Sequence, residues 1–229
     1  MSIQRLFIYG AGGHGKVVAD ILIAQKAPGF AGFIDDGAEL RGKSVLGFPV
    51  CGDRLWLKHE LRKTPVKVAL GIADNPIRQQ LAAKCLAWGA ELATLVHPAA
   101  SVSASARLGP GTVVMAHAVI NPNAKIGGGS IVNTSAVIEH DVELGEFVHV
   151  APNAALGGAS RLGKLSHLGI GAVVIQCINI GEHTVIGAGA VVVRDIPDNV
   201  IAFGVPARIH RSLDLDDSQH ISSGRRRHD

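Results

Sequence analysis

The stretch RLGPGTVVMAHAVINPNAKIGGGSIVNTSAVIEHDVELGEFVHV, residues 107–150, repeats one short pattern from end to end. An aliphatic residue recurs at every sixth position without an insertion, and the run continues on both sides of this stretch. All seventeen of these positions hold Val, Ile or Leu: Val96, Val102, Leu108, Val114, Ile120, Ile126, Val132, Ile138, Leu144, Val150, Leu156, Leu162, Leu168, Val174, Ile180, Ile186 and Val192. The residue two places before each aliphatic is usually small, as at Ala118 and Ser130. An unbroken repeat of this kind predicts stacked units that bury their aliphatic side chains against one another.

Glycine adds a longer period to this repeat. Five glycines that each follow an aliphatic residue lie 18 positions apart: Gly109, Gly127, Gly145, Gly163 and Gly181. Since eighteen is three times six, each coil should have three short strands and three corners, and we interpret the glycines as corner positions with an unusual backbone conformation. The prediction is a triangular parallel β-helix. The spacing leaves its handedness open, and the general crossover preference would favour a right-handed one.

Before Val96 the six-residue repeat is absent and the residue pattern is different. Apolar runs at residues 5–10, 29–36 and 66–72 are typical of buried strands, and residues 11–26 and 74–89 are typical of helices, the second with Pro76 near its start. This alternation predicts a small parallel α/β unit of Rossmann type. We therefore expect an α/β domain over residues 1–95, a β-helix over residues 96–210 and a disordered tail over residues 211–229.

Composition narrows the possible partners. The formal net charge is only +3 and aromatic residues make up 4% of the chain, so the clustered basic face with stacking aromatics of a nucleic-acid binder is not expected. No apolar run approaches the roughly 20 residues of a membrane-spanning helix. Three widely separated cysteines without CxxC spacing, and an N-terminus without a leader pattern, predict a cytoplasmic protein.

A glycine-rich loop joins the first predicted strand to the first predicted helix. Gly10, Gly12 and Gly15 fit the pattern G-x-G-x-x-G, and Asp35 follows at the distance of the ribose-binding acid in dinucleotide folds. Fewer than 100 residues leave no room for a second mononucleotide-binding half, and His14 projects where a pyrophosphate would need space. We therefore expect a nucleotide-diphosphate ligand of another kind, with a tight turn that binds nothing as the alternative.

The triplet Glu139-His140-Asp141 stands out in the otherwise apolar coils. A solvated corner would explain it, since polar residues gather at the bends of any β-helix. A histidine beside a carboxylate is also the simplest general base near neutral pH. Gly158 follows His140 by 18 residues and should therefore lie one coil further on, about 4.8 Å away along the axis. Because a glycine amide can approach a ligand closely and serve as an oxyanion donor, the pair predicts acyl transfer.

Two further histidines, His149 and His167, are also 18 apart and should stack, with His149 in a groove between coils and His167 at the surface. A β-helix trimer can collect histidines around zinc, as in the gamma-class carbonic anhydrases. That arrangement needs three specific histidines across a subunit interface, and the sequence selects no three. No metal site is predicted.

Several motifs together resemble one known family: GAGGHGK at residues 10–16, IDD at 34–36, LGIADNPIR at 70–78, IEHD at 138–141, GEFVHV at 145–150 and GVPAR at 204–208. The chain resembles the sialic acid O-acetyltransferase family, which includes the nucleotide-linked amino-sugar N-acetyltransferases of the bacillosamine and perosamine pathways. The resemblance covers residues 1 to about 210. It implies a left-handed β-helix, a homotrimer with active sites between subunits, and acetyl-CoA as co-substrate without a metal.

The resemblance also implies roles for individual residues. His140 is the expected general base, Asp141 the acid that raises its basicity, and Gly158 the oxyanion amide. The expected acetyl-CoA groove holds His149, Gly158, Ile170 and Ala188. The expected sugar-nucleotide site holds Gly13, His14, Gly15, Asp35, Asp36 and Gly71, with Asn75 as a weaker assignment.

The activity implied is transfer of an acetyl group from acetyl-CoA to the amine of a UDP- or GDP-linked 4-amino-4,6-dideoxy sugar, as in O-antigen or other glycan biosynthesis. O-acetylation of a sialic acid or a related sugar hydroxyl is the alternative within the family. A non-catalytic NAD-sensing or scaffold protein is the alternative from another class, and it would leave the pairing of His140 with Gly158 without a use.

Overall fold

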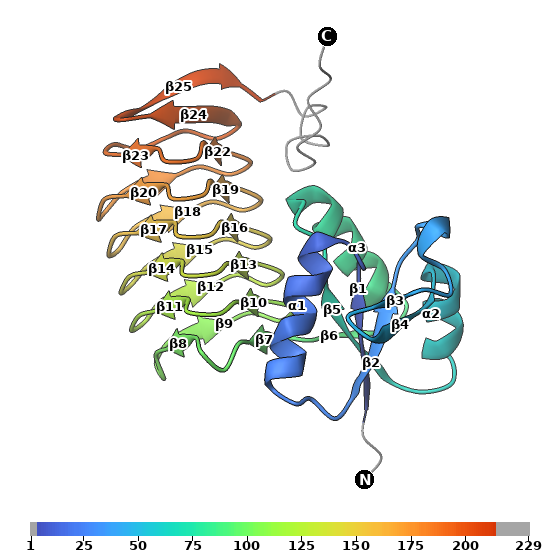
Figure 1. Cartoon of the computed structure of the whole chain (residues 1–229). Helices are drawn as coiled ribbons and strands as arrows, with labels where there is room; N and C mark the ends of the chain where they lie inside the picture. Colours follow the sequence, from blue (N-terminus) through green and yellow to red (C-terminus); the bar gives the residue numbers. More distant parts are fainter. Residues whose placement is uncertain (1–3, 214–229) are drawn as a thin grey trace.

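The computed structural model describes residues 4–213, which form an α/β domain that packs beside a β-helix (Figure 1). Most of the tail predicted over residues 211–229 lies outside the described residues. The elements of the α/β domain are β1 (Arg5–Tyr9), α1 (Gly13–Ala24), β2 (Phe30–Ile34), η1 (Ala38–Leu40), β3 (Ser44–Val45), β4 (Phe48–Gly52), α2 (Arg54–Leu61), β5 (Val66–Leu70), α3 (Asn75–Ala87) and β6 (Glu91–Leu92).

The sheet of the α/β domain has the strand order β3-β4-β2-β1-β5-β6, and β1 pairs in parallel with both β2 and β5. The three strands predicted from apolar runs are thus confirmed. Strand order reverses its direction at β1, so the carboxyl ends of β1, β2 and β5 meet at a topological switch point, where α/β folds place their ligands.

The helices cover the two faces of this sheet. On one side α1 lies between the sheet and the β-helix (Figure 1), and its Val18 and Leu22 share an apolar cluster with Val113 and Ile131 of the coils. On the other side α2 and α3 pack against the sheet. The predicted second helix is confirmed as α3, where the carboxylate of Asp74 accepts the N–H of Ile77 at 2.9 Å as an N-cap.

The β-helix consists of two-residue strands joined by tight corners. Their bounds are β7 (Leu95–Val96), β8 (Ser101–Val102), β9 (Arg107–Leu108), β10 (Val113–Val114), β11 (Val119–Ile120), β12 (Lys125–Ile126), β13 (Ile131–Val132), β14 (Val137–Ile138), β15 (Glu143–Leu144), β16 (His149–Val150), β17 (Ala155–Leu156), β18 (Arg161–Leu162), β19 (His167–Leu168), β20 (Val173–Val174), β21 (Asn179–Ile180), β22 (Val185–Ile186) and β23 (Val191–Val192). Each strand pairs in parallel with the strand 18 residues on, for example Ile120 with Ile138. The periodic aliphatic residues form the core, largely buried from Val114 onwards.

Three sheets make the sides of the prism, and their outward residues differ in character. The covered face (β7, β10, β13, β16, β19 and β22) lies beneath the α/β domain. The apolar face presents Val119, Val137, Ala155, Val173 and Val191 from β11, β14, β17, β20 and β23. The charged face presents Arg107, Lys125, Glu143, Arg161 and Asn179 from β9, β12, β15, β18 and β21. Outward and inward side chains alternate as they do in any β-strand.

The corners adopt left-handed backbone at every sixth residue, and most of these residues are not glycine. They are Gly111, His117, Asn123, Gly129, Ser135, Asp141, Phe147, Asn153, Ala159, Leu165, Gly171, Cys177, His183 and Gly189. Our interpretation of the 18-residue glycines was therefore wrong. A Cβ at Gly109 would lie 2.5 Å from the backbone nitrogen of Gly128 on the next coil, so close approach of coils, rather than a positive φ, requires glycine there.

An antiparallel hairpin of β24 (Val200–Gly204) and β25 (Ala207–Ser212) closes the C-terminal end of the β-helix (Figure 1). β24 pairs in parallel with β22, and Ala202 and Ala207 are buried over the last coil. The hairpin covers the end of the apolar core, and its last residue, Ser212, lies two residues beyond the predicted boundary at 210.

Candidate active site

His140 and Asp141 occupy the corner that joins the apolar face to the charged face. Asp141 adopts left-handed backbone with φ of 59°, which turns its carboxylate back towards the preceding residue. Nδ1 of His140 lies 2.8 Å from Oδ2 of Asp141, and the two side chains are 62% and 52% exposed in the single chain. The hydrogen bond from His140, followed by one from Asn123, lowers the pKa of Asp141, so this group is a carboxylate at neutral pH.

Gly158 lies one coil beyond His140 on the same corner, as the period of 18 predicts. A Cβ at Gly158 would lie 2.6 Å from Nε2 of His140, so the imidazole stands directly against the glycine. The N–H of Ala159 donates to the carbonyl of His140 at 2.9 Å and fixes the spacing of the two coils. Within residues 4–213, the Gly158 N–H has no hydrogen-bond acceptor. With Nδ1–H directed at Asp141, the lone pair on Nε2 is left free on the side of the ring that lies against Gly158.

The glycines of the loop after β1 have two different reasons to be there. A Cβ at Gly10 would lie 2.7 Å from the carbonyl oxygen of Gly71, and a Cβ at Gly15 would overlap the carbonyl oxygen of Gly10. These three residues let α1, β1 and β5 approach closely. In contrast, a Cβ at Gly12 or Gly13 would meet nothing within 4 Å. Packing therefore explains Gly10, Gly15 and Gly71, whereas Gly12 and Gly13 keep open the approach to the N-terminus of α1.

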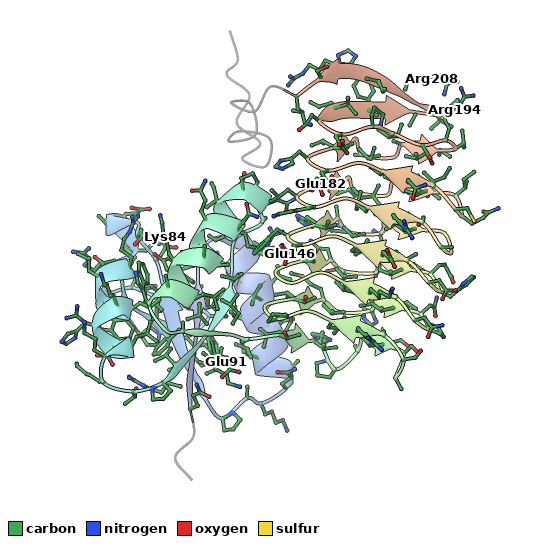
Figure 2. All side chains as sticks on the ribbon, turned by 180° about the vertical axis from the view of Figure 1, so that it is seen from behind. Lys84, Glu91, Glu146, Glu182, Arg194 and Arg208 are labelled. Carbon is green, nitrogen blue, oxygen red and sulfur yellow. The ribbon has the colours of Figure 1, made fainter. Side chains whose placement is uncertain are left out.

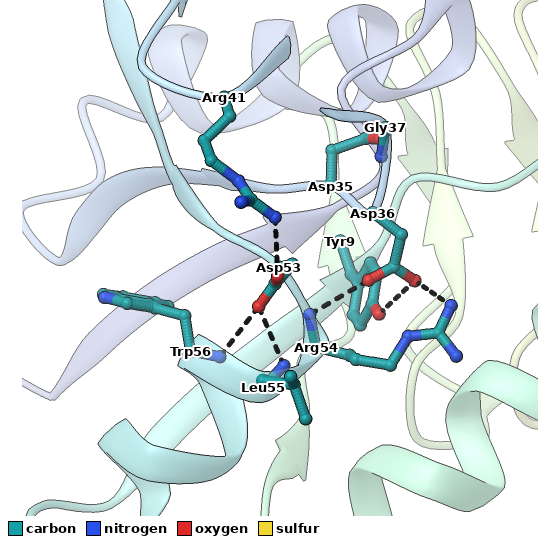
Figure 3. Close-up of polar contacts among 9 residues, drawn as sticks. All are labelled: Tyr9, Asp35, Asp36, Gly37, Arg41, Asp53, Arg54, Leu55 and Trp56. Atoms are coloured by element: carbon teal, nitrogen blue, oxygen red, sulfur yellow. Dashed lines mark hydrogen bonds and ion pairs between the residues drawn. The ribbon is translucent and has the colours of Figure 1, made fainter. Parts of the chain in front are cut away.

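Two acids follow β2, and both are already engaged inside the chain (Figure 3). Oδ2 of Asp35 accepts the N–H of Ala11 at 2.7 Å, and its Oδ1 accepts the N–H of Gly37 at 2.8 Å. Asp35 therefore fixes the glycine loop itself, and its assignment to the sugar-nucleotide site stays a prediction. The side chain of Asp36 is taken up by the hydroxyl of Tyr9 at 2.8 Å and by the guanidinium of Arg54 at 2.8 Å.

These contacts shape a cleft at the switch point of the sheet. It has a volume of about 200 Å³ and is lined by Tyr9, Gly10, Asp35, Asp36, Arg54, Ile72, Ile77, Gln80, Leu81 and Lys84. Burial raises the pKa of Tyr9, as does its bond to Asp36, so the phenol stays protonated. Burial would raise the pKa of Asp36, but hydrogen bonds from Arg54 outweigh it and the net shift is downward.

The sequence did not point to Tyr9, Arg54, Gln80 and Lys84 as lining residues. Tyr9 ends the first strand, and its position next to the glycine loop was a usable signal. Gln80 and Lys84 lie one helical turn apart on α3, and Lys84 projects on the side of the domain away from the β-helix (Figure 2). Their spacing of four is ordinary for a helix, so only the packing of α3 beside the cleft identifies them.

Three histidines gather where the α/β domain covers the β-helix. The ring of His14 lies 6.1 Å from that of His149, and the ring of His149 lies 4.8 Å from that of His167. The predicted stacking of the last two is confirmed by their strand register. His167 is half-buried rather than fully at the surface, and desolvation there lowers its pKa to about 4.

Burial also lowers the pKa of His14 to about 4 and that of His149 well below its usual value. Nε2 of His149 faces the side-chain amide of Asn133 at 3.0 Å, and its ring also bonds to the backbone of Ala73. Nε2 of His14 is buried without a hydrogen-bond partner among the described residues. All three histidines are thus neutral at pH 7, and His14 has a free ring nitrogen.

The α/β domain and the β-helix are joined by a fully buried arginine, Arg78. Its guanidinium donates to backbone carbonyls on both sides, among them Ala73 at 2.9 Å and, on the coils, Gly129 at 2.7 Å. Asn75 accepts from Arg78 at 2.7 Å and donates to the carbonyls of Leu165 and Ser166, each at 3.0 Å. The side chain of Asn75 is therefore buried in the domain interface of the single chain, and its assignment to the sugar-nucleotide site stays a prediction.

The residues expected at the acetyl-CoA groove fall on different sides of the prism. Ile170, 59% exposed, and Ala188 lie on the corner between the covered face and the apolar face. Gly158 lies on the opposite edge of the apolar face, whereas His149 is beneath the α/β domain. A single chain thus separates the four residues. The exposed edge with Ile170 and the edge with Gly158 flank the apolar face on its two sides.

Within residues 4–213, no cluster of three or more His, Cys, Asp or Glu side chains is arranged to hold a metal ion. No helix in that part of the chain is both long and apolar enough to cross a membrane.

The chain is similar to known proteins in both of its parts. Residues 5–85 match the family described as the PglD N-terminal domain. Over 118 residues, the chain is 39% identical to the UDP-N-acetylbacillosamine N-acetyltransferase of Bacillus subtilis strain 168, with 50% of this chain and 52% of the relative covered. The chain thus spans about half the length of the curated relatives it matches.

Solved structures cover almost the whole chain. PerB from Caulobacter crescentus, in complex with CoA and GDP-perosamine, is 42% identical with a TM-score of 0.84, and the match covers 92% of this chain and 99% of that chain. The acetyltransferase domain of PglB from Neisseria gonorrhoeae, in complex with acetyl coenzyme A, is 38% identical with a TM-score of 0.82, and the match covers 91% and 100%.

These similarities confirm the fold class, an α/β Rossmann-like domain followed by a left-handed parallel β-helix. The right-handed crossover preference does not hold here, because it depends on the twist of long strands and these strands have two residues each. Together with the coils, the glycine loop and the His140 corner, the similarity along nearly the full length identifies the chain as a member of the hexapeptide-repeat acetyltransferase family.

Proposed function

We propose that this protein transfers the acetyl group of acetyl-CoA to the amine of a nucleotide-linked 4-amino-4,6-dideoxy sugar. One observation carries the proposal: the imidazole of His140 lies against Gly158, and the carboxylate of Asp141 is hydrogen-bonded to the other ring nitrogen, Nδ1. A base and a fixed N–H donor on neighbouring coils are the two groups that attack on a thioester carbonyl requires.

The residues divide the chemistry between them. As the amine attacks the thioester carbonyl, His140 takes up the amine proton at Nε2. The C–N bond forms, the C–S bond breaks, and the imidazolium gives its Nε2 proton to the departing sulfur, so CoA leaves as the thiol. Asp141 holds the ring by its Nδ1–H and stabilises the imidazolium. The Gly158 N–H donates to the carbonyl oxygen while negative charge develops there. No covalent acetyl-enzyme is required.

The nucleotide is proposed to bind at the α/β domain. The open backbone at Gly12 and Gly13 lies at the N-terminus of α1, where N–H groups and the helix dipole favour a diphosphate. The cleft lined by Tyr9, Arg54 and Lys84 would accommodate the base and ribose. Asp35 contributes by holding the loop in place, and Asp36 by holding Arg54 and Tyr9.

The complete site is proposed to form between copies of the chain in a homotrimer. Valine and alanine side chains on the apolar face remain half-exposed in one copy, with Val173 at 41%. Burial of such a surface against a second copy is favourable by roughly 25 cal/mol per Å². The Ile170 and Gly158 edges flank this face on its two sides. Contact between two copies would therefore bring the Ile170 edge of one copy beside the Gly158 edge of the other, and the two edges would form one groove for acetyl-CoA.

Thiol release from acetyl-CoA tests the activity. Purified protein is incubated with acetyl-CoA and with GDP-perosamine, a UDP-linked 4-amino-4,6-dideoxy sugar or free sialic acid. We expect release with at least one nucleotide-linked amino sugar and an amide in the product. An ester product from sialic acid would favour the O-acetyltransferase alternative, and no release with any acceptor would favour a scaffold.

The His140→Ala variant tests the mechanism. Loss of the base should lower kcat on the order of 10²–10⁴-fold, whereas His59→Ala, a change at an exposed histidine of α2, should leave kcat unchanged. An active His140→Ala variant, or an acetylated protein detected by mass spectrometry during turnover, would contradict the mechanism.

A separate variant tests the assembly. Val173→Asp places a charge on the apolar face and should give monomers without activity, whereas Asn179→Asp on the charged face should leave the assembly intact. Light scattering after size-exclusion chromatography measures both. A monomeric Val173→Asp protein with full activity would rule out a site shared between copies.

A further inference from the structure

One coil before the His140 corner, an asparagine repeats the geometry of Asp141. Asn123 precedes Asp141 by 18 residues and has left-handed backbone with φ of 61°, against 59° for Asp141. The two side chains therefore project from the same corner in the same direction, one above the other. Asparagine and aspartate are the non-glycine residues that tolerate this backbone best.

The side chains of the two residues are in contact. Nδ2 of Asn123 lies 3.2 Å from Oδ1 of Asp141, and Oδ2 of Asp141 lies 2.8 Å from Nδ1 of His140. Since an ionised carboxylate only accepts hydrogen bonds, the group of Asn123 that faces it must be the NH₂. The carboxylate thus bridges an amide on one coil and the imidazole on its own coil.

Asn123 is itself held from the coil before it. Its N–H donates to the hydroxyl of Ser105 at 3.1 Å, and that hydroxyl lies 3.1 Å from the hydroxyl of Ser103. A chain of hydrogen bonds therefore runs from Ser105 through Asn123 and Asp141 to His140. Its free end is Nε2, the atom that stands against Gly158.

The neighbouring charged groups explain why an amide suits this position. Glu143 forms ion pairs with both nearby cations, Lys125 at 2.8 Å and Arg161 at 3.3 Å. Asp141 is therefore contacted by a neutral donor, and its charge remains available to an imidazolium at His140. The other acid at this corner, Glu139, accepts the backbone N–H of His140 at 3.3 Å.

We infer that Asn123 is a positioning residue for the proposed reaction: its side-chain amide fixes the Asp141 carboxylate, which in turn orients the imidazole of His140. The inference rests on the proposed function. Asn123 has no place among the residues that the resemblance implies, and in this role it acts only through Asp141.

The test is a double-mutant cycle between Asn123 and Asp141. Asn123→Gly removes the amide but keeps a residue that accepts positive φ. With acetyl-CoA and either GDP-perosamine or a UDP-linked 4-amino-4,6-dideoxy sugar, we expect kcat to fall about fivefold to tenfold, or about 1–1.4 kcal/mol, with KM for both substrates within twofold of wild type. Asn123→Gly added to Asp141→Asn should lower kcat no further, because the carboxylate that Asn123 holds is gone.

Asn199→Gly is the matched control, since Asn199 also has left-handed backbone, with φ of 56°, on another corner. It should leave kcat unchanged. The inference is overturned if Asn123→Gly keeps wild-type kcat, if its effect adds fully to that of Asp141→Asn, or if Asn199→Gly lowers kcat equally.

A crystal structure of the Asn123→Gly variant gives a result that does not depend on activity. We expect the Asp141 carboxylate to rotate and lose its contact with Nδ1 of His140. An Asp141 side chain in its original place overturns the inference, even for a protein that acetylates neither probe. Absence of activity in the wild-type protein would instead count against the proposed function.

Discussion

Substitution of Gly158 by alanine tests the geometry of the site most directly. The added Cβ would lie 2.6 Å from Nε2 and 2.7 Å from Cε1 of His140. A carbon and a ring nitrogen in ordinary contact are about 3.5 Å apart, so the ring must move by about 0.9 Å. Displacement of a catalytic group by about 1 Å can cost about 100-fold in rate, or about 2.7 kcal/mol in the barrier.

The same substitution should have little effect on the fold. Gly158 does not have a positive φ, and Ala116 and Ala188 occupy equivalent corner positions on other coils. The His140 side chain is 62% exposed, so it can rotate away, at the cost of its contact with Asp141. We expect a melting temperature within a few degrees of wild type, measured by scanning fluorimetry, and a kcat reduced about 100-fold in the thiol-release assay.

In the His140→Ala background, the added methyl group meets no ring. Gly158→Ala should then lower kcat by much less than it does in the wild-type protein. A Gly158→Ala protein with more than half of the wild-type kcat would refute the reasoning. So would a large fall in melting temperature, because it would mean that the ring is locked in place rather than free to turn.

Other consequences concern the loop, the domain interface and acid stability. Gly13→Ala should leave the melting temperature unchanged but raise KM for the nucleotide sugar at least about tenfold. Gly15→Ala should instead lower the melting temperature, because its Cβ would overlap the carbonyl of Gly10. Equal stability of the two variants would contradict this assignment. Arg78→Met leaves several buried carbonyls without a hydrogen-bond donor and should lower the free energy of unfolding by roughly 3–5 kcal/mol in urea titrations. A loss under 1 kcal/mol would show that the Arg78 contacts are not needed for stability. The pKa of His14 and of His167 is about 4 in the fold and about 6.5 in the unfolded chain, so the unfolded chain binds more protons between these values. Stability should therefore fall as the pH is lowered from about 6.5 to about 4. His167→Gln should make that slope shallower, and an unchanged slope would contradict the pKa assignment.

Positions within the β-helix were predictable from the sequence, whereas the constraint that acts at each position was not. The stacking of His140 with Gly158, and of His149 with His167, followed from arithmetic on a period of 18. The spacing is a reliable guide because every coil repeats the same hydrogen-bonded register. Two residues 18 positions apart in the sequence therefore lie at the same place on neighbouring coils. The same regularity misled us about Gly109 and its equivalents, since spacing marks a recurrent position without saying whether φ or a close neighbour is the constraint.

In the α/β domain, sequence spacing does not determine the contacts of individual side chains. Asn75 and Asp35 matched motif positions, yet their side chains bond to Leu165 and Ser166 and to Ala11 and Gly37 within the chain. A motif predicts which residue types occur at a site, but polar atoms bond to whatever the packed chain brings nearest. The spacing of Arg78 gave no sign that its side chain would be fully buried.

The sequence by itself therefore determined the coils, their register and the His140 corner, because short-range periodicity in a linear stack leaves one arrangement that buries the aliphatic residues. Only the tertiary structure decided which face the α/β domain covers, and with it the burial of His149, the partial burial of His14 and His167, and the buried contacts of Arg78. Those contacts join residues such as Arg78 and Gly129, 51 positions apart, whose meeting no local spacing encodes.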